Sequence, residues 1–271
     1  MRIAILGAGT IAQLVIGELR RGALAGVELC GILGRPGSPR AKAAAAQSGA
    51  PLFTDRQALL AARPDAVLEA ASHEAVREHL LALLDARISV VVLSAGALVD
   101  DALRQAAERA SARTGALLYV PSGGIGALDA LKAACVAGVE SASIEVAKPP
   151  QAWKGIPYVE ALAVRLDSLT TPLVLFEGPA RAGVPHFPQN VNIAAVLAMG
   201  GIGLDRTRLK VLADPGLTRN THTIRVEGRS GRFTLVLENV PDPDNPKTSL
   251  LACCSALAAL KQLASPVRYG T

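Results

Sequence analysis

The 271-residue chain is poor in aromatic residues, which make up 3% of it, although 50% of its residues are hydrophobic. A core must therefore be built mainly from Ala, Leu, Val and Ile, and few rings are present on which nucleic-acid bases could stack. The net charge of +5 is spread along the chain without a run of Lys and Arg. This composition favours a globular protein whose partners do not include nucleic acid.

Cysteine is scarce, and long apolar runs are missing. The four cysteines, Cys30, Cys135, Cys253 and Cys254, do not have the spacing of metal ligands, which predicts reduced thiols and no metal site. No apolar stretch reaches the length of a membrane span, and no cleavage site follows the apolar N-terminus. We therefore expect a soluble cytoplasmic protein without a membrane partner.

A glycine-rich turn follows a short apolar run at residues 2–6 and precedes an amphipathic stretch. The spacing G-x-G-x-x-A, in the order strand, turn and helix, is typical of a dinucleotide-binding fold. The first glycine permits the tight turn, the second lets the backbone approach a pyrophosphate, and the free N–H groups of the helix bind phosphate. The residues predicted to contact the cofactor here are Gly7, Gly9, Thr10, Ile11 and Ala12.

An acidic residue is absent after the second predicted strand, residues 27–33, where an NAD-selective site would have one to bind the adenosine ribose. Arg35 and Ser38 stand there instead and could contact a 2′-phosphate, although Arg35 could equally be a solvated loop cation. We therefore expect NADP to be accepted, beside NAD. Ser94 follows the buried strand at residues 89–93, so it is a further candidate for cofactor binding.

Strands alternate with helices over the first 120 residues, which predicts a Rossmann-type, doubly wound parallel sheet. From residue 121 to 245 strands follow one another with few helices, which predicts a second, α+β substrate domain. An apolar helix is expected at residues 248–263, but the pattern does not say where it docks. The first predicted helix is the amphipathic stretch that carries Ile11, Leu14, Val15 and Leu19 on one face. The other predicted helices cover residues 40–48, 56–62, 72–85, 101–114, 128–137 and 191–199, and the other predicted strands cover residues 66–70, 116–120, 141–146, 173–177, 210–213, 222–226 and 232–237.

Histidine is the usual proton acceptor beside a carbon that exchanges hydride, and this chain has four. His73 and His79 fall on a predicted helix of the first domain, where a surface or capping role is the simpler interpretation. His186 precedes a polar turn that could face a cleft. His222 lies on a predicted strand of the second domain, and spacing alone favours it little over His186.

Five segments together resemble the L-aspartate dehydrogenase family, and they follow the family's order over nearly the whole chain. They are PSGGIGALDAL (121–131), KPPQAWKG (148–155), FPQNVNIAA (187–195), ADPGLTRNTH (213–222) and NPKTS (245–249). The resemblance implies NAD(P)-dependent oxidation of L-aspartate to iminoaspartate, which hydrolyses to oxaloacetate and ammonia or supplies NAD biosynthesis. It also implies that the C-terminal helix, within residues 246–271, returns to the dinucleotide domain.

The family's residues carry over by position. Its catalytic histidine matches His222, and its nucleotide-contacting positions match Gly124, often alanine in the family, and Asn190. A substrate with two carboxylates needs cationic or N–H donors. The candidates for substrate binding are Lys148, Asn190, Lys247 and Thr248, with solvation or helix capping as the alternative for either lysine. We also expect a homodimer.

Two other functions stay open at this point. Members of the family resemble homoserine dehydrogenase and dihydrodipicolinate reductase in plan, so a reductase of a related imine or semialdehyde is one alternative. A protein that senses NADP without catalysis is the other. The presence of His222 and Asn190 argues against the sensor, because a sensor would be free to lose them.

Overall fold

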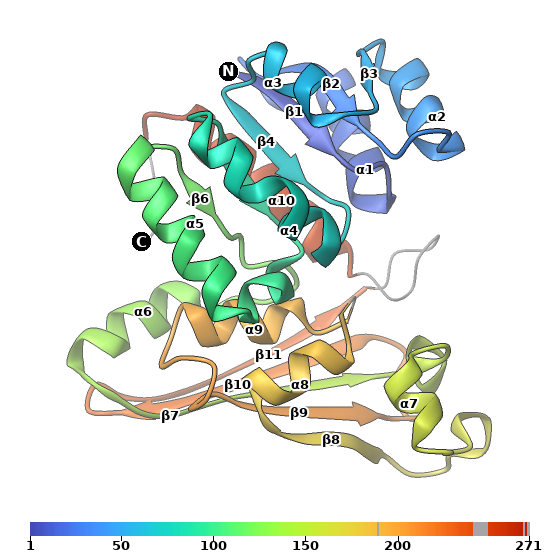
Figure 1. Ribbon diagram of the computed structural model, residues 1–271. Helices are drawn as coiled ribbons and strands as arrows, with labels where there is room; N and C mark the ends of the chain where they lie inside the picture. The colour runs from blue at the N-terminus through green and yellow to red at the C-terminus, as the bar shows by residue number, and fades with distance from the viewer. Residues whose placement is uncertain (189, 241–248, 268, 270–271) are drawn as a thin grey trace. The chain divides into compact units, whose positions relative to one another are not determined.

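The computed structural model describes residues 1–188, 190–240, 249–267 and 269, and it divides the chain into two units (Figure 1). The first unit contains residues 1–121 together with the segment that begins at Cys253. The second unit contains Ser122–Ala252. Each unit has its own sheet, and each is described separately.

The first unit is a six-stranded parallel sheet in the order β3-β2-β1-β4-β5-β6. Its strands are β1 (Arg2–Leu6), β2 (Glu28–Leu33), β3 (Leu52–Phe53), β4 (Ala66–Glu69), β5 (Ser89–Val92) and β6 (Leu118–Tyr119). Because the strand order reverses at β1, the carboxyl ends of β1 and β4 form a topological switch point, where ligands bind in such sheets. The predicted Rossmann-type fold is confirmed.

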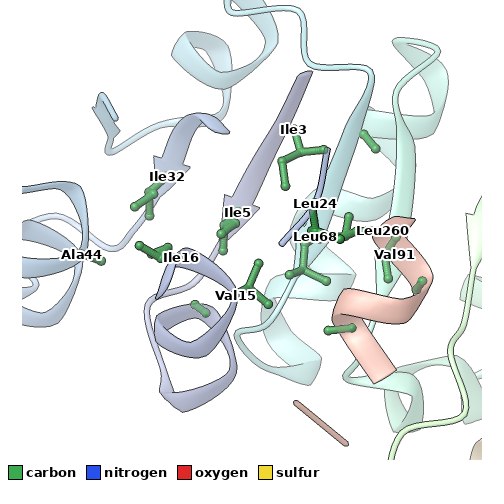
Figure 2. Close-up of a cluster of buried hydrophobic side chains, with 14 residues drawn as sticks. Ile3, Ile5, Val15, Ile16, Leu24, Ile32, Ala44, Leu68, Val91 and Leu260 are labelled. Atoms are coloured by element: carbon green, nitrogen blue, oxygen red, sulfur yellow. The ribbon is translucent and has the colours of Figure 1, made fainter. Parts of the chain in front are cut away.

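The core on one face of this sheet is built from small and branched aliphatic residues (Figure 2). Ile3 and Ile5 of β1 belong to it, and the residue between them does not, because successive side chains of a strand point to opposite faces. The helices on this face are α1 (Thr10–Arg20), α2 (Pro39–Ser48) and α10 (Leu250–Ala264). From α10 the core receives Ala256, Ala259 and Leu260, so the C-terminal helix packs in the first unit.

Other helices cover the opposite face. Val67 and Val90 alternate with the residues of the first core and are also fully buried. The helix α4 contacts both β5 and α5, and it buries Val76, Leu80 and Leu83. The remaining helices of this unit are α3 (Arg56–Ala61), α4 (His73–Asp85), η1 (Ala95–Val99) and α5 (Asp101–Thr114). Helices on both faces make the sheet doubly wound.

The second unit is a mixed five-stranded sheet in the order β11-β10-β7-β9-β8, in which only the β7–β9 pair is parallel. Its strands are β7 (Val139–Lys148), β8 (Leu173–Pro179), β9 (Arg208–Ala213), β10 (Asn220–Gly228) and β11 (Gly231–Asn239). Its helices are α6 (Leu128–Ala137), η2 (Pro150–Trp153), α7 (Pro157–Ala161), η3 (Leu166–Ser168), α8 (Ala180–Gly183), η4 (Val184–His186) and α9 (Asn192–Met199). The expected α+β architecture is confirmed.

The two faces of this sheet differ in burial. On one face Ile144, Val146 and Ile224 are buried, and α6 and α9 contact the strands β10 and β7. On the other face Arg225 and Val236 are exposed. Strand pairing sets His222 beside Val146, so the histidine lies on the buried face. A polar residue at such a position needs a partner or a function, because burial without a hydrogen bond is costly.

Candidate active site

The glycine turn between β1 and α1 is sterically restricted at its first glycine. Gly7 has φ +107, and a β-carbon there would lie 2.5 Å from the carbonyl oxygen of Ala70. The Gly7 N–H donates to the Leu33 carbonyl over 2.9 Å, which joins the turn to the end of β2. Only glycine fits here, because another residue would meet both a left-handed backbone and a backbone clash.

The N-terminus of α1 is left open for an anion. The next four α-helices of the unit, α2 to α5, begin at side-chain caps, which are Ser38, Asp55, Ser72 and Asp100. Gly9 begins α1 without a side-chain cap, and a β-carbon on Gly9 would come no nearer than 4.0 Å to the Ala70 carbonyl oxygen. The first N–H groups of the helix, at Thr10 and Ile11, therefore have no side-chain cap. Uncapped donors with a positive dipole end suit a pyrophosphate, so the residues present fit a dinucleotide.

Arg35 is exposed in the loop after β2. A β-carbon at Gly34 would lie 2.4 Å from the Cβ of Ala41, so residue 34 has no room for a side chain. Arg35 is therefore the first residue beyond the strand that can present a functional group. Arg35 lies two residues after Leu33, whose carbonyl accepts a hydrogen bond from the Gly7 N–H of the glycine turn.

Ser94 lies at the end of β5, where its side chain binds Glu69 of β4. The Ser94 N–H and hydroxyl donate to the Glu69 carboxylate over 2.9 and 2.8 Å, and the N–H groups of Ala71 and Leu93 donate to it as well. Glu69 is 1% exposed. Burial raises the pKa of this carboxyl, while the hydrogen bonds from Ser94, Ala71 and Leu93 oppose that rise.

Sequence reasoning missed Glu69. The available signal was an acidic residue ending an otherwise apolar strand at the ligand-binding edge of the sheet. Its carboxylate holds the ends of β4 and β5 together beside the glycine turn.

Lys148 ends β7 and is 2% exposed. Its ammonium group donates to the Asn190 side-chain oxygen over 3.0 Å and lies 5.4 Å from the centroid of the Trp153 ring. Asn190 is also buried. The indole of Trp153 donates to the Leu212 carbonyl, which fixes the ring under the lysine. The structure thus brings together two of the predicted substrate-binding residues around one buried positive charge.

His222 of β10 is 2% exposed, and its Nδ1 lies 3.0 Å from the Gly124 carbonyl oxygen. Its Nε2 is buried and has no hydrogen-bond partner among the described residues. Burial, and then the positive charge of Lys148, lower the pKa of His222 to about 4. The ring is therefore neutral near pH 7, with one nitrogen unengaged.

Gly124 contributes its carbonyl to His222 from the segment that precedes α6. A β-carbon at Gly124 would lie 3.5 Å from His222 Cε1 and 3.6 Å from Ser249 Cβ, which is ordinary contact. The position therefore has room for the alanine that the resemblance associates with it. Ser249 also accepts from the Asn220 amide over 3.3 Å, so the start of α10 is tied to β10.

Of the other histidines, His73 and His79 belong to the first unit and His186 to the second. His73 and His79 were expected at the surface or as caps, but they are 8% and 9% exposed on α4, which is capped by Ser72 instead. That expectation was wrong because the helix buries this side against its neighbours. The exposed ring of His186 stacks on Tyr158 at 4.1 Å. Lys247 and Thr248 lie outside the described residues.

Membrane spans and metal sites are missing from the described part of the chain. Within it, no helix is both long and apolar enough to span a membrane. Within it, too, no three His, Cys, Asp or Glu side chains gather as metal ligands would.

A doubly wound sheet with an uncapped glycine turn, together with a neutral buried histidine beside a lysine, defines a nicotinamide-dependent dehydrogenase. Two family models match the chain: the NAD binding domain of homoserine dehydrogenase over residues 7–121, and the C-terminal domain of aspartate dehydrogenase over residues 129–263.

Individual relatives agree. The chain is 38% identical to L-aspartate dehydrogenase of Methanocella arvoryzae over 100% of this chain and 99% of that protein. It is 44% identical to the Methanosarcina barkeri enzyme of that name over 76% of each chain. The crystal structure of aspartate dehydrogenase from Thermotoga maritima is similar with a TM-score of 0.75 at 25% identity, covering 100% of this chain and 99% of that one. The chain belongs to the L-aspartate dehydrogenase family.

Proposed function

We propose that this protein oxidises L-aspartate with NAD or NADP to iminoaspartate and a reduced nucleotide, releasing one proton. Water then converts iminoaspartate to oxaloacetate and ammonia. The observation that carries the proposal is the buried cluster of His222, Lys148 and Asn190, found in a member of this family. The nicotinamide group, when bound, accepts the hydride from the α-carbon of the substrate.

In this proposal the first unit holds the nucleotide. The N–H groups at Gly9, Thr10 and Ile11 bind the pyrophosphate, and Arg35 contacts the 2′-phosphate of NADP. Support comes from the missing cap of α1 and from the lack of room for a side chain at Gly34. Ser94, through its hydrogen bonds to Glu69, holds the ends of β4 and β5 in place at the cofactor-binding edge of the sheet.

Lys148 and Asn190 are proposed to bind substrate in the second unit. The Lys148 ammonium group, with the Asn190 amide oxygen 3.0 Å away, offers a charge-assisted contact to one carboxylate. Lys247 and Thr248 are proposed to contact the other carboxylate on the resemblance alone. Gly124 and Asn190 are proposed to contact the nucleotide as well.

His222 is proposed to move the protons. Hydride leaves the α-carbon only when the amine is unprotonated, so Nε2 accepts a proton from the substrate ammonium group. The positive charge of Lys148 lowers the pKa of His222 in the free protein. A bound carboxylate offsets that charge and makes the ring a stronger base when substrate is present. After Nε2 has released this proton to solvent, the same nitrogen activates water for attack on the imine carbon.

The decisive experiment is an assay of reduced-nicotinamide absorbance with a panel of amino acids, both nucleotides, and the reverse reaction from oxaloacetate and ammonia. Turnover with L-aspartate supports the proposal. Turnover only with another amino acid, a cyclic imine or a semialdehyde would replace the substrate. Tight nucleotide binding without turnover of any of these would favour a sensor.

We further propose that the protein is a cytoplasmic homodimer and that its iminoaspartate feeds NAD biosynthesis. The apolar side chains Val174 and Val236 are exposed on β8 and β11, the two edge strands of the second sheet, where a second copy would find unpaired strand edges. Light scattering at several protein concentrations measures the mass. A monomer throughout would contradict the dimer.

A further inference from the structure

The side chain of Asn239 lies against His222 at the end of β11. Strand pairing sets Asn239 opposite Asn220 and His222 opposite Leu237, so the two side chains share the buried face of the sheet. The Asn239 amide nitrogen is 2.9 Å from the Gly124 carbonyl oxygen and 3.1 Å from His222 Nδ1. Asn239 is 6% exposed, and it was not among the site residues expected from the sequence.

The three polar groups have only two consistent arrangements. In the first, Nδ1 of His222 carries the proton and donates to the Gly124 carbonyl, which accepts a second hydrogen bond from Asn239. In the second, Nδ1 is unprotonated and accepts from Asn239, and the Gly124 carbonyl then receives no hydrogen bond from the imidazole.

The buried environment of Nε2 decides between them. The second arrangement puts a proton on Nε2, which has no partner among the described residues. An unpaired buried N–H is rarer in proteins than an unpaired acceptor. The first arrangement leaves a lone pair on Nε2, and both lone pairs of the Gly124 carbonyl are used.

We propose that Asn239 is a positioning residue for His222: its amide anchors the Gly124 carbonyl, which holds the imidazole with Nδ1 protonated and the Nε2 lone pair free for the substrate. This inference rests on the proposed function, because it gives the base of that reaction its tautomer. In other enzymes, too, a hydrogen-bonding partner fixes the tautomer and the orientation of a catalytic imidazole.

The charge of the side chain at residue 239 explains why an amide suits this position better than a carboxylate. A carboxylate at residue 239 would also accept from Nδ1–H, but it would stabilise the imidazolium form. The groups that act on His222 are the Lys148 ammonium, which disfavours a second positive charge, and the Gly124 carbonyl, which favours it weakly. An uncharged amide leaves this balance in favour of the neutral ring.

The first test needs no variant. In protein labelled with ¹⁵N-histidine, the ring nitrogen shifts distinguish the two tautomers, and the signals of His222 are assigned as those missing from the His222→Asn protein. Protonated Nδ1 with unprotonated Nε2 at pH 7.5 is the expected result. Protonated Nε2 would overturn the proposal.

The second test uses Asn239→Asp and Asn239→Ala. The carboxylate should move the acid limb of kcat/KM for aspartate to higher pH by at least about one unit. The alanine variant removes the amide that anchors the Gly124 carbonyl, so the imidazole is held less firmly and kcat should fall at least about tenfold, with nucleotide affinity unchanged. Glu238→Gln, which exchanges a carboxylate for an amide at the neighbouring exposed residue, is the matched control. It should change neither the acid limb of kcat/KM nor kcat.

These readouts separate the two proposals. Absence of aspartate turnover in the unmodified protein would contradict the proposed function, and full turnover of His222→Asn would remove His222 as its base. Loss of turnover in His222→Asn, together with an unchanged acid limb in Asn239→Asp and an unchanged kcat in Asn239→Ala, would contradict the role of Asn239 alone. If either Asn239 variant fails to fold, the other variant and the tautomer of the unmodified protein still decide.

Discussion

Lys148 donates from its ammonium group to the side-chain oxygen of Asn190, with both side chains buried in the second unit. The two residues are 42 positions apart in the chain. An amide oxygen stabilises the charge without neutralising it, so the lysine keeps a net positive charge that can attract a carboxylate. The same charge lowers the pKa of His222. In the proposed reaction, substrate binding and proton transfer are therefore coupled through Lys148.

Replacement of His222 by Asn should lower turnover about 100-fold to 10,000-fold, because it removes the proton acceptor. The Asn side chain can still donate to the Gly124 carbonyl as Nδ1 does, so nucleotide affinity should persist. The free energy of unfolding should fall by at most about 1 to 3 kcal/mol. Turnover and melting are measured on one preparation. His186→Asn, at an exposed ring, is the control, and a destabilised but fully active His222→Asn would end the catalytic role.

The stability of the protein should depend on His222 in acid. The pKa is lowered from 6.5 to about 4 in the folded protein, so between these values the unfolded chain binds a proton that the folded chain does not. Stability from this group is complete above about pH 6.5 and is lost as pH falls toward 4, by up to roughly 3 kcal/mol. Denaturant unfolding of the native and His222→Asn proteins at several pH values measures the difference. A difference independent of pH would contradict the lowered pKa.

Lys148→Met should raise KM for aspartate about 10-fold to 100-fold, the equivalent of one lost charge-assisted hydrogen bond. It should also move the acid limb of kcat/KM to higher pH, since Lys148 is one cause of the low pKa of His222. The pH profile is measured beside that of Lys210→Met, a half-exposed lysine of β9. Unchanged KM and acid limb would assign Lys148 to structure alone.

Arg35→Asp should weaken NADP selectively, by roughly 1 to 3 kcal/mol, because a cation at the 2′-phosphate is replaced by an anion. Affinities for NADP and NAD are measured by titration of protein fluorescence or by calorimetry. Arg109→Asp, an exposed exchange on α5, is the control for net charge. An equal loss for both nucleotides would show that Arg35 does not contact the phosphate.

Glu69→Gln should lower the free energy of unfolding by about 1 to 3 kcal/mol. One carboxylate oxygen becomes an NH₂ group that faces the donors of Ser94, Ala71 and Leu93. Nucleotide affinity should fall as well, because the ends of β4 and β5 lose their link. Glu78→Gln, exposed on α4, is the control in thermal melts, and identical melts of the two variants would contradict this role.

Much of the fold follows from local sequence. The helix at residues 101–114 was predicted to the residue, because Asp100 caps its start and Gly115 ends it in the left-handed conformation. Strand ends were less well predicted: β7 extends from Val139 to Lys148, beyond the expected 141–146, because pairing with both neighbours supports residues of low strand propensity.

The sequence by itself determined the dinucleotide fold and, through resemblance, the family and the candidates His222, Lys148 and Asn190. Hydrophobic periodicity and glycine spacing are local, and a single chain carries them in full. The resemblance also implied that the C-terminal helix returns to the dinucleotide domain, whereas its hydrophobic pattern did not. Only the tertiary structure brought Glu69 to Ser94 and Asn239 to His222. Those side chains meet because strand pairing and burial bring distant segments together. The sequence does not distinguish a buried acidic or amide residue from an exposed one, because its hydrogen-bonding partner is far away in the chain.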